Sequence, residues 1–421
     1  MISISCSKIK RVYILGGLIL KVVVIGAGPA GMMAAMTAGK EHNVTLIDGN
    51  EKVGKKLFIT GKGRCNVTNS RDISDFFDYI YGNPHFLYSS LYTFTNEDTI
   101  KFFEEQNIKL KSERGGRVFP KSDKSSDIIK GLTNGLKKVK VDIKLNSKVI
   151  ELICDNRIIK GAKIDDGSII YGDYFIIATG GASYPLTGST GDGQRFAKKL
   201  GHNIIPLRPS LVPVELKNEW IKELSGLTLK NIGISLKEGK KILYKDQGEI
   251  KFTTFGITGP LTLKASRFIL EGKYKIILDL KPALDENELD KRVQKDFKKY
   301  INKAFKNSLD DLLPKQIIPF ILEESKIDIN KKVNEITKEE RRKLVDLIKN
   351  IELEVKGLRS LKEAIVTAGG VDTLEIDPST MKSKIIDNLS FAGEVIDVDA
   401  FTGGYNVQIA LSTGFIAGNN I

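Results

Sequence analysis

The sequence predicts an α/β protein built on a doubly wound parallel sheet, into which a second, β-rich segment and a small helical segment are inserted. Three observations predict this fold. Near the N-terminus, a β-branched run is followed by a glycine turn and a helix of small residues. Short β-type segments separated by glycine turns occupy the middle of the chain, and Lys- and Glu-rich segments with helical spacing follow them. A chain of 421 residues has room for roughly two or three domains of about 150 residues each.

Residues 1–20 are interpreted as a leader that is disordered or non-native. The apolar run 12–20 follows three basic residues, but it lacks the small-residue cleavage site of a secretory signal. Lys21 interrupts the run before it is long enough to span a membrane. One hypothesis is that translation starts near Leu20. We therefore expect neither secretion nor stable membrane insertion.

The next segment predicts a nucleotide-binding β-α-β unit. Residues 21–25 suit a buried strand, residues 26–31 read Gly-Ala-Gly-Pro-Ala-Gly, and residues 32–38 suit a helix. A second buried strand, residues 44–47, ends at Asp48. A right-handed crossover should make the two strands parallel.

Each part of the glycine turn has a role in binding a pyrophosphate. Gly26 allows the tight turn, Gly28 lets the phosphates approach the backbone, and Gly31 permits close packing of the helix. The helix N-terminus, at Pro29 and Ala30, supplies amide donors and a partial positive charge.

Asp48 follows Gly26 by 22 positions and should accept hydrogen bonds from the hydroxyls of an adenosine ribose. An acidic residue there disfavours a 2′-phosphate, so FAD or NAD is expected rather than NADP. The alternative is a glycine turn followed by an incidental surface aspartate.

Two further glycine clusters favour FAD over NAD. Thr179-Gly180-Gly181 follows a buried strand and offers a second close approach to the backbone. Gly393-Glu394 and then Gly403-Gly404-Tyr405-Asn406 place glycine loops at a helix N-terminus near the chain end. Such a helix N-terminus beside the pyrimidine edge of an isoalloxazine would stabilise the anion formed on reduction. Alternatively, both clusters are ordinary strand-to-helix turns.

The segments group into domains by composition. The expected arrangement is a nucleotide-binding domain at 21–200 and 372–421, an inserted, mostly antiparallel β domain at 201–282 and 350–371, and a helical subdomain at 283–349.

Composition excludes several classes of protein. Three cysteines without a C-x-x-C spacing and three histidines argue against a disulfide scaffold, a zinc finger, a haem c site and a dithiol reductase. No metal site is expected, and a cytoplasmic setting fits the low cysteine content. The net charge of +13 suggests a polyanionic partner.

Residues 54–69 read GKKLFITGKGRCNVTN, and this text resembles a block of the BaiN/YhiN-type bacterial flavoproteins. The segments 114–120, 187–193 and 393–408 are similar to further blocks of that family. The resemblance implies a glutathione-reductase-like FAD-binding domain with an inserted β-barrel-like domain and a helical subdomain. Thr254 stands where a histidine of the family is expected, so no role of that histidine can be transferred.

The same resemblance implies an NAD(P)H-dependent flavin reductase. The activities proposed for the family are reduction of a uridine in large-subunit ribosomal RNA to dihydrouridine, a step of bile-acid dehydroxylation, and oxidation of a small amine. The candidates for phosphate or flavin contacts within residues 54–69 are Lys56, Thr60, Gly63, Arg64 and Asn66.

Charge favours RNA among these acceptors. Residues 106–149 carry twelve Lys or Arg and four Asp or Glu, and residues 52–71 carry six Lys or Arg and no acid. The RNA-binding candidates are Arg114, Arg117 and Lys121, and salt-sensitive binding would be the consequence. The alternative is a solvated, Lys-rich surface.

Cys65 is a candidate general acid. Reduction of the C5=C6 bond of uracil needs a hydride at C6 and a proton at C5, and a thiol with an ordinary pKa near 8.5 is mostly protonated at pH 7. The alternative is a small buried residue that packs the loop.

The sequence therefore predicts an FAD-dependent oxidoreductase that takes a hydride from NAD(P)H and passes it to an unsaturated acceptor, preferably a base of ribosomal RNA. A flavoenzyme for a small organic substrate is the second hypothesis. A non-catalytic flavin- or RNA-binding protein is the third.

Overall fold

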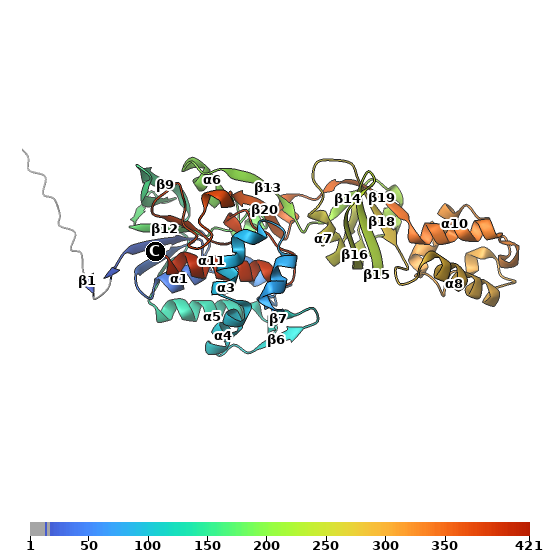
Figure 1. Ribbon diagram of the computed structural model, residues 1–421, viewed down its shortest axis with the longest axis horizontal. Coiled ribbons are helices and arrows are strands. Elements are labelled where there is room, and N and C mark those ends of the chain that lie inside the picture. Colours follow the sequence, from blue (N-terminus) through green and yellow to red (C-terminus); the bar gives the residue numbers. More distant parts are fainter. Residues whose placement is uncertain (1–12, 15–16) are drawn as a thin grey trace, which may run out of the picture. The chain divides into compact units, whose positions relative to one another are not determined.

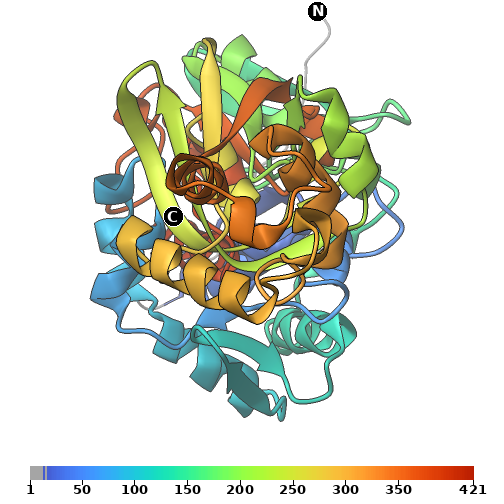
Figure 2. The same cartoon turned by 90° about the vertical axis from the view of Figure 1, so that its right-hand side faces the viewer.

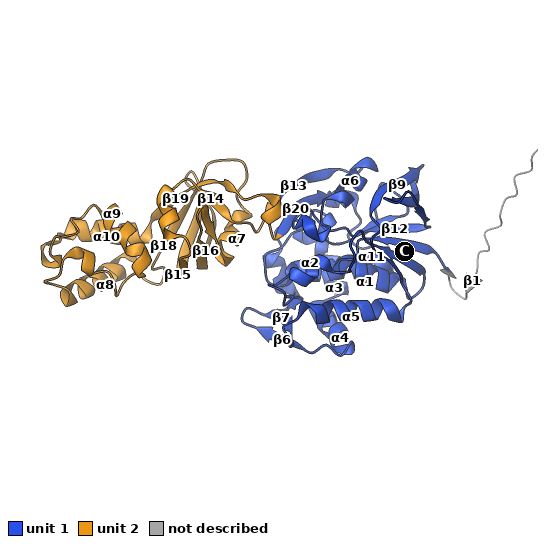
Figure 3. Ribbon diagram, turned by 180° about the vertical axis from the view of Figure 1, so that it is seen from behind, with its two compact units in different colours: residues 1–208, 366–421 blue, residues 209–365 orange. Residues whose placement is uncertain are grey.

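The computed structural model describes residues 13–14 and 17–421, and these form two compact units (Figure 3). Unit 1 comprises residues up to Arg208 and residues from Val366 onward, and unit 2 comprises Pro209–Ile365. Most of the predicted leader, residues 1–12 and 15–16, lies outside the described residues. Within the leader, β1 (Tyr13–Ile14) pairs with β2 (Gly17–Leu18) in antiparallel fashion.

The core of unit 1 is a five-stranded parallel sheet (Figure 1). Its strand order is β21 (Leu389–Phe391), β12 (Tyr174–Ile177), β3 (Lys21–Ile25), β4 (Asn43–Ile47) and β8 (Asp142–Lys144). All four strand pairs are parallel. The central strand β3 is buried from Val22 to Ile25, as expected for an apolar, β-branched run covered on both faces.

Helices α1 (Pro29–Ala38) and α11 (Tyr405–Asn419) pack closely against each other because their contact positions are small. A Cβ atom at Gly414 or at Gly418 would lie 2.3 Å from the carbonyl oxygen of Ala30 or of Ala34, respectively. The last helix of the chain therefore completes the packing of the first long one.

The remaining elements of unit 1 surround this core. The helices are α2 (Lys55–Ile59), α3 (Tyr88–Thr93), α4 (Asn96–Glu105), α5 (Ser125–Lys138) and α6 (Asp192–Lys199), with 3-10 segments η1 (Ile73–Tyr79), η2 (Pro84–Leu87), η3 (Pro185–Thr187), η9 (Thr373–Glu375) and η10 (Gly393–Val395). Two three-stranded antiparallel sheets have the orders β5 (Thr68–Asn69), β7 (Arg117–Pro120), β6 (Leu110–Glu113) and β11 (Ile169–Tyr171), β10 (Ile158–Ile164), β9 (Val149–Asp155). A two-stranded sheet joins β13 (Ile204–Ser210) to β20 (Val366–Val371).

Unit 2 contains a closed, antiparallel six-stranded barrel. The strand order is β14 (Val214–Leu216), β17 (Gly256–Thr258), β16 (Lys241–Phe252), β15 (Thr228–Glu238), β18 (Tyr274–Asp279) and β19 (Ile351–Leu358). Its other elements are α7 (Pro260–Ser266), α8 (Glu286–Lys299), α9 (Ile318–Ser325), α10 (Lys338–Lys349), η4 (Glu219–Leu224), η5 (Phe305–Asn307), η6 (Lys315–Ile317), η7 (Val333–Glu335) and η8 (Leu361–Glu363). Helices α8 and α10 lie side by side (Figure 2).

The barrel and the helical segment of unit 2 share one hydrophobic core. Ile276 and Leu353 from the barrel belong to the same buried cluster as Leu289, Val293 and Leu344 from the helices. The predicted fold class, a doubly wound domain with an inserted barrel-like domain and a small helical part, is confirmed. Across residues 13–14 and 17–421, no helix combines the length and the hydropathy of a membrane span.

Candidate functional site

The glycine turn between β3 and α1 leaves one of its glycines beside open space. Gly26 has a φ of +104° and donates its N–H to the carbonyl of Ile47 at 2.8 Å. A Cβ atom at Gly26 would lie 2.5 Å from the oxygen of Ala178, and one at Gly31 would lie 1.8 Å from the Gly26 oxygen. At Gly28 a Cβ atom would meet nothing within 4 Å. Packing of the protein thus requires the first and third glycines, whereas the second lies beside space that a pyrophosphate can occupy.

The N-terminus of α1 lies at this opening. Gly28 is its N-cap and has an extended conformation, and no side chain of the described residues caps the helix. Helical hydrogen bonding begins with the N–H of Met32, which donates to the carbonyl of Gly28 at 2.9 Å. The uncapped end offers amide donors and a partial positive charge to an anion.

Asp48 links the end of β4 to the glycine turn. Its Oδ2 accepts from the N–H of Ala27 at 2.7 Å, and its Oδ1 accepts from the backbone N–H and from the Nδ2 of Asn50, both at 2.8 Å. Since each carboxylate oxygen has two lone pairs, Oδ2 keeps the capacity to accept from a ribose hydroxyl.

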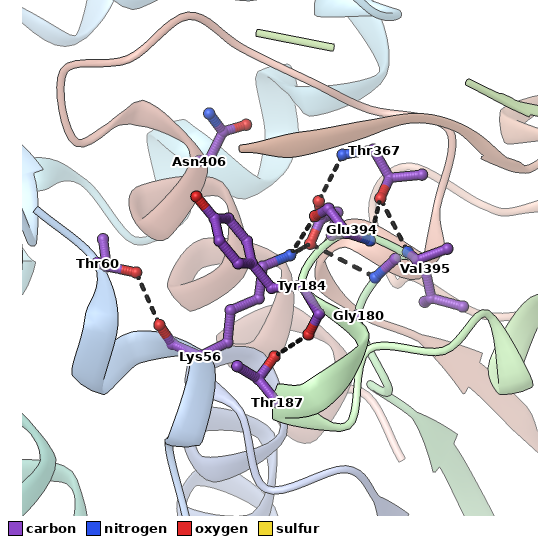
Figure 4. A network of polar contacts seen from close by, with 12 residues as sticks. Lys56, Thr60, Gly180, Tyr184, Thr187, Thr367, Glu394, Val395 and Asn406 are labelled. Atoms are coloured by element: carbon purple, nitrogen blue, oxygen red, sulfur yellow. Dashed lines mark hydrogen bonds and ion pairs between the residues drawn. The ribbon is translucent and has the colours of Figure 1, made fainter. Parts of the chain in front are cut away.

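A partly buried ion pair joins α2 to η10 (Figure 4). The Nζ of Lys56 lies 2.6 Å from Oε2 of Glu394 and 2.8 Å from the Oγ of Ser183. The side chains of Lys56 and Glu394 are only 24% and 21% exposed. Glu394 also accepts from the N–H of Thr367 at 2.8 Å and from the N–H of Gly181 at 3.4 Å. Lys56, Gly181 and Glu394, predicted from three distant segments, therefore meet in one network.

The same network contains residues that the sequence analysis did not find. The Oγ1 of Thr367 accepts from the N–H groups of Ala182 and Ser183 at 2.8 and 3.1 Å. A Cβ atom at Gly181 would lie 2.3 Å from this hydroxyl. The only sequence signal for this threonine was the glycine pair at 369–370, which follows it on β20.

The C-terminal glycine loops contact α1 and β5. Gly393 has a φ of +74°, and a Cβ atom there would lie 2.8 Å from the Cβ of Ala30 on α1. Gly404 is the N-cap of α11, and a Cβ atom at this residue would lie 2.2 Å from the carbonyl oxygen of Thr68. Gly393 thus lies against the first β-α-β unit, and Gly404 lies against β5.

The side chains of Tyr405 and Asn406 take part in packing and in the structure of the loop. The ring of Tyr405 stacks on that of Tyr79 at a centroid distance of 4.7 Å, and burial raises the pKa of its hydroxyl. The amide of Asn406 accepts from the N–H of Ala400 at 2.9 Å and donates to the carbonyl of Ala400 at 2.7 Å. Their side chains shape the loop, which leaves the backbone at the start of α11 for a ligand.

Among the described residues, five buried side-chain polar atoms of unit 1 have no hydrogen-bond partner. Besides His42 Nδ1 and Thr99 Oγ1, they are Asn66 Oδ1, Thr179 Oγ1 and Gln194 Oε1. The Nε2 of Gln194 donates to the carbonyl of Gly180 at 3.1 Å, which holds this side chain at the predicted glycine cluster. A ligand that carries hydroxyl and N–H donors, as FAD does, would satisfy such atoms. These three acceptor atoms therefore fit the hydroxyl and N–H groups of the predicted cofactor.

Cys65 lies at the centre of the loop that follows α2. It has a φ of +57°, its side chain has no exposed surface, and burial raises the pKa of its thiol to about 12. Its N–H donates to the carbonyl of Thr60 at 2.9 Å, while the Oγ1 of Thr60 donates to the carbonyl of Lys56 at 3.0 Å. Gly63 has a φ of +83° with open space around its Cβ position. This geometry favours the packing role of Cys65 over proton donation.

Arg64 is engaged with carboxylates. Its guanidinium forms ion pairs with Glu113 and, at 2.8 Å, with Asp123, and it lies 4.1 Å from the centroid of the Phe119 ring. Lys111 pairs with Asp123 at 2.6 Å. The pKa values of both carboxyl groups are lowered, chiefly by hydrogen bonds from Arg64 to Glu113 and from Lys111 to Asp123. The carboxylates of Glu113 and Asp123 therefore compete with the phosphate or flavin contact that was predicted for Arg64.

The predicted RNA-binding residues lie on the β6–β7 hairpin and just after it. Arg114, Arg117 and Lys121 are exposed. The Nε of Arg117 donates to the carbonyl of Arg114 at 3.1 Å, and no carboxylate of the described residues forms an ion pair with any of the three. Arg117 helps to lower the pKa of Glu113, but within the described residues the three basic side chains are exposed and form no ion pair.

Curated relatives match the chain over almost its whole length. It is 31% identical over 408 residues to the 3-dehydro-bile acid delta(4,6)-reductase of Clostridium scindens, with 94% of this chain and 98% of the relative covered. It is 30% identical to the ribosomal RNA dihydrouridine synthase of Escherichia coli, with 95% and 97% covered, and 32% identical to that of Haemophilus influenzae, with 93% and 96% covered. These relatives confirm the predicted class of enzyme, an oxidoreductase.

Solved structures share the fold. A flavocytochrome c3 fumarate reductase in its open conformation aligns with a TM-score of 0.50 at 19% identity, over 95% of this chain and 78% of that one. The HI0933-like protein Rossmann domain family matches residues 20–420. Together with the curated relatives, this match shows that the chain belongs to the HI0933-like family, which confirms the predicted resemblance.

Proposed function

We propose that this protein is an FAD-dependent oxidoreductase that takes reducing equivalents from NAD(P)H and reduces an unsaturated bond, and that its acceptor is a uridine of ribosomal RNA. The observation that carries the RNA proposal is the position of the basic hairpin. Strand β7 pairs Arg117 with Asn69 of β5, and the neighbouring Thr68 contacts Gly404 of the C-terminal glycine loop. Exposed basic side chains that form no ion pair within the described residues thus lie one short strand away from the proposed flavin site.

FAD, when bound, supplies a ring that accepts a hydride and passes it to an unsaturated bond. The residues of this chain would bind and orient it. The N-terminus of α1 and the open face of Gly28 would bind the pyrophosphate, and Oδ2 of Asp48 would accept from the ribose. The unpartnered acceptors at Asn66 and Thr179 would receive its remaining donors.

Lys56 and Glu394 would hold α2 and η10, on two sides of the cofactor site, in fixed relative positions. Their ion pair fixes α2 to η10, and Glu394 in turn accepts from the backbone of Gly181 and of Thr367. Because the pair is partly buried, it is screened less by salt than a fully exposed pair.

The exposed arginines suit an RNA backbone because a guanidinium binds phosphate through two parallel hydrogen bonds. Two relatives at 30% and 32% identity are named ribosomal RNA dihydrouridine synthases, which supports the same acceptor. A small organic acceptor has no need of Arg114, Arg117 and Lys121 on a projecting hairpin.

A small apolar acceptor is the second candidate, and one observation favours it. Phe58 and Leu186 are 54% and 90% exposed, on the two segments that the hydrogen bond from Lys56 to Ser183 joins. Exposed apolar side chains at this place suit an apolar, steroid-like compound. The relative at 31% identity is named a bile acid reductase.

One experiment separates these proposals from a non-catalytic role. Ribosomal RNA from a deletion strain and from its parent is digested, and dihydrouridine is quantified by mass spectrometry. We expect one dihydrouridine to be missing from the deletion strain and to return when the gene is restored. Equal dihydrouridine in both strains would reject RNA as the acceptor. Bound FAD that neither NADH nor NADPH reduces would favour the non-catalytic hypothesis.

A further inference from the structure

The side chain of Asn69 joins two functional segments of unit 1. Asn69 is 1% exposed, and its Nδ2 donates to the carbonyl of Gly115 and to the carbonyl of Gly403, both at 3.0 Å. Gly115 lies in the turn of the basic β6–β7 hairpin, and Gly403 lies in the C-terminal glycine loop. A single amide group therefore ties the hairpin to that loop.

The hairpin turn is fitted to this amide. Gly116 has a φ of +74°, and a Cβ atom there would lie 2.3 Å from the Oδ1 of Asn69. The N–H of Ser70 donates to the carbonyl of Gly116 at 2.7 Å. Any side chain at Gly116 would displace the turn from Asn69.

The orientation of the amide is determined by its surroundings. Oδ1 of Asn69 accepts from the N–H of Arg71 at 3.1 Å, whereas Nδ2 faces two carbonyl oxygens. A flipped amide would place its oxygen against both carbonyls and its NH₂ group against an N–H, so only one orientation satisfies all partners.

The helix that follows the glycine loop, α11, is also hydrogen-bonded to strand β5. The Oγ1 of Thr68 donates to Oε1 of Gln408 at 2.7 Å, and Gln408 is fully buried in the first turns of α11. Strand β5 thus contacts the hairpin, the glycine loop and α11 within two residues.

We propose that Asn69 is a positioning residue that couples RNA bound on the hairpin to the glycine loop at the flavin. This inference rests on the proposed function, in which Arg114 and Arg117 hold the RNA backbone. They flank the turn that Asn69 fixes, so the distance from the bound phosphates to the loop is set by this amide. A misplacement of about 1 Å can slow a reaction roughly 100-fold.

The test uses the variant Asn69→Asp. The substitution keeps the shape of the side chain and the acceptor for Arg71, but it removes both donated hydrogen bonds. Asn96→Asp is the matched control, because Asn96 is also buried and donates through Nδ2 to two carbonyls, those of Asn69 and Arg71, without reaching the glycine loop. Asn69→Ala is a second variant that adds no charge.

We expect Asn69→Asp and Asn69→Ala to keep FAD content and flavin reduction by NAD(P)H, and to bind an oligouridylate within about threefold of the wild type. RNA-dependent reoxidation should fall by roughly 10- to 100-fold. Reoxidation by a small artificial acceptor should be unchanged. Asn96→Asp should leave all five quantities near the wild type.

Hydrogen–deuterium exchange supplies a readout that does not depend on turnover. Adding the oligouridylate should slow exchange in residues 113–117 and 400–406 of the wild-type protein and of Asn96→Asp. In both Asn69 variants it should slow exchange only in residues 113–117. Equal effects of Asn69→Asp and Asn96→Asp on RNA-dependent reoxidation would overturn the proposal, and so would protection of both segments in Asn69→Asp. If the wild type reduces no RNA but shows coupled protection, the proposed function fails and the coupling stands.

Discussion

The Nζ of Lys56 and the Oε2 of Glu394 lie 2.6 Å apart, although 338 residues separate them in the sequence. Unit 2 lies between these two residues in the sequence, so both ends of the chain supply one half of this contact each. The ion pair can therefore form only when the two sequence segments of unit 1 have come together.

The first prediction concerns the strength of this pair. A double-mutant cycle with Lys56→Met and Glu394→Gln should give a coupling energy of about 1–3 kcal/mol, between the values typical of exposed and of fully buried pairs. Denaturant unfolding of the apoprotein measures it. The matched control is the pair of Lys275 and Glu352 in the barrel, whose side chains are 52% and 57% exposed and should couple by less than about 1 kcal/mol. Equal coupling in both pairs would contradict the prediction.

The second prediction separates the glycines of the turn. Gly28→Val should fold with nearly unchanged stability, because its Cβ meets no protein atom, but its FAD content should fall at least tenfold. Gly31→Ala should instead reduce stability, because its Cβ would lie 1.8 Å from the Gly26 oxygen. Absorbance of the bound flavin and thermal unfolding of the apoprotein distinguish the two effects. Normal flavin content in Gly28→Val would show that the pyrophosphate lies elsewhere.

The third prediction concerns salt dependence. Changing Arg114, Arg117 and Lys121 to Gln should weaken binding of ribosomal RNA fragments and reduce the slope of log K against log salt by about one unit for each lost phosphate contact. FAD content should stay the same.

A control for this prediction removes the same charge elsewhere. Lys291, Lys295 and Lys298 on α8 are exposed, and their change to Gln should leave the slope unaltered. If both triple variants change the slope equally, the hairpin is part of a general solvated surface. That result would favour the small organic acceptor over RNA.

The fourth prediction addresses Cys65. Because its thiol is fully buried and its pKa is raised to about 12, Cys65→Ala should lose roughly 1 kcal/mol of stability and keep both half-reactions per bound flavin. Stopped-flow traces measure the two half-reactions separately. A decrease of two to four orders of magnitude in the oxidative half-reaction alone would instead identify Cys65 as the general acid.

The fifth prediction is a pH dependence at His202. Its side chain is buried between Glu375, 3.1 Å from Nδ1, and Ser383, 2.9 Å from Nε2. Burial lowers the pKa of His202, against the attraction of Glu375. The unfolded chain therefore binds this proton more readily than the folded protein, so the contribution of the neutral ring is present above about pH 6.5 and is lost as pH falls further.

Comparison with His202→Gln isolates this contribution. The difference in free energy of unfolding between wild type and variant should shrink below about pH 6.5, by at most about 1.4 kcal/mol per pH unit. A difference that stays constant from pH 7.5 to pH 5 would show that the ring does not titrate differently in the folded protein.

The nucleotide-binding unit was predictable because its determinants are local. A β-branched strand, a glycine turn and a small-residue helix lie within twenty residues, and Gly26 and Gly31 are glycine for steric reasons that the sequence pattern captures. The family of the chain was predictable from the continuous block at 54–69.

The rest of the site depends on partners that are distant in the sequence. Arg64 was expected to contact phosphate or flavin, which stays a prediction. The two carboxylates that Arg64 contacts lie 49 and 59 positions away, and neither is marked by a motif. Thr367 was missed because a hydroxyl that accepts from backbone N–H groups leaves no periodicity in the sequence. Ser183 was missed because its hydroxyl accepts from Lys56, which lies 127 positions away. The sequence also could not reveal that the helical segment shares its core with the barrel, since helical spacing defines a buried face and not what covers it.

The close fit of α11 on α1 has a consequence for synthesis on the ribosome. Helix α1 is complete after residue 38, but Gly414 and Gly418, which seat against it, emerge almost four hundred residues later. The intervening unit 2 has its own hydrophobic core and can form while the first β-α-β unit still lacks its covering helix. The nascent chain must therefore keep an apolar face of α1 available until α11 has been synthesised, so the contact between these two helices forms only after unit 2 has emerged.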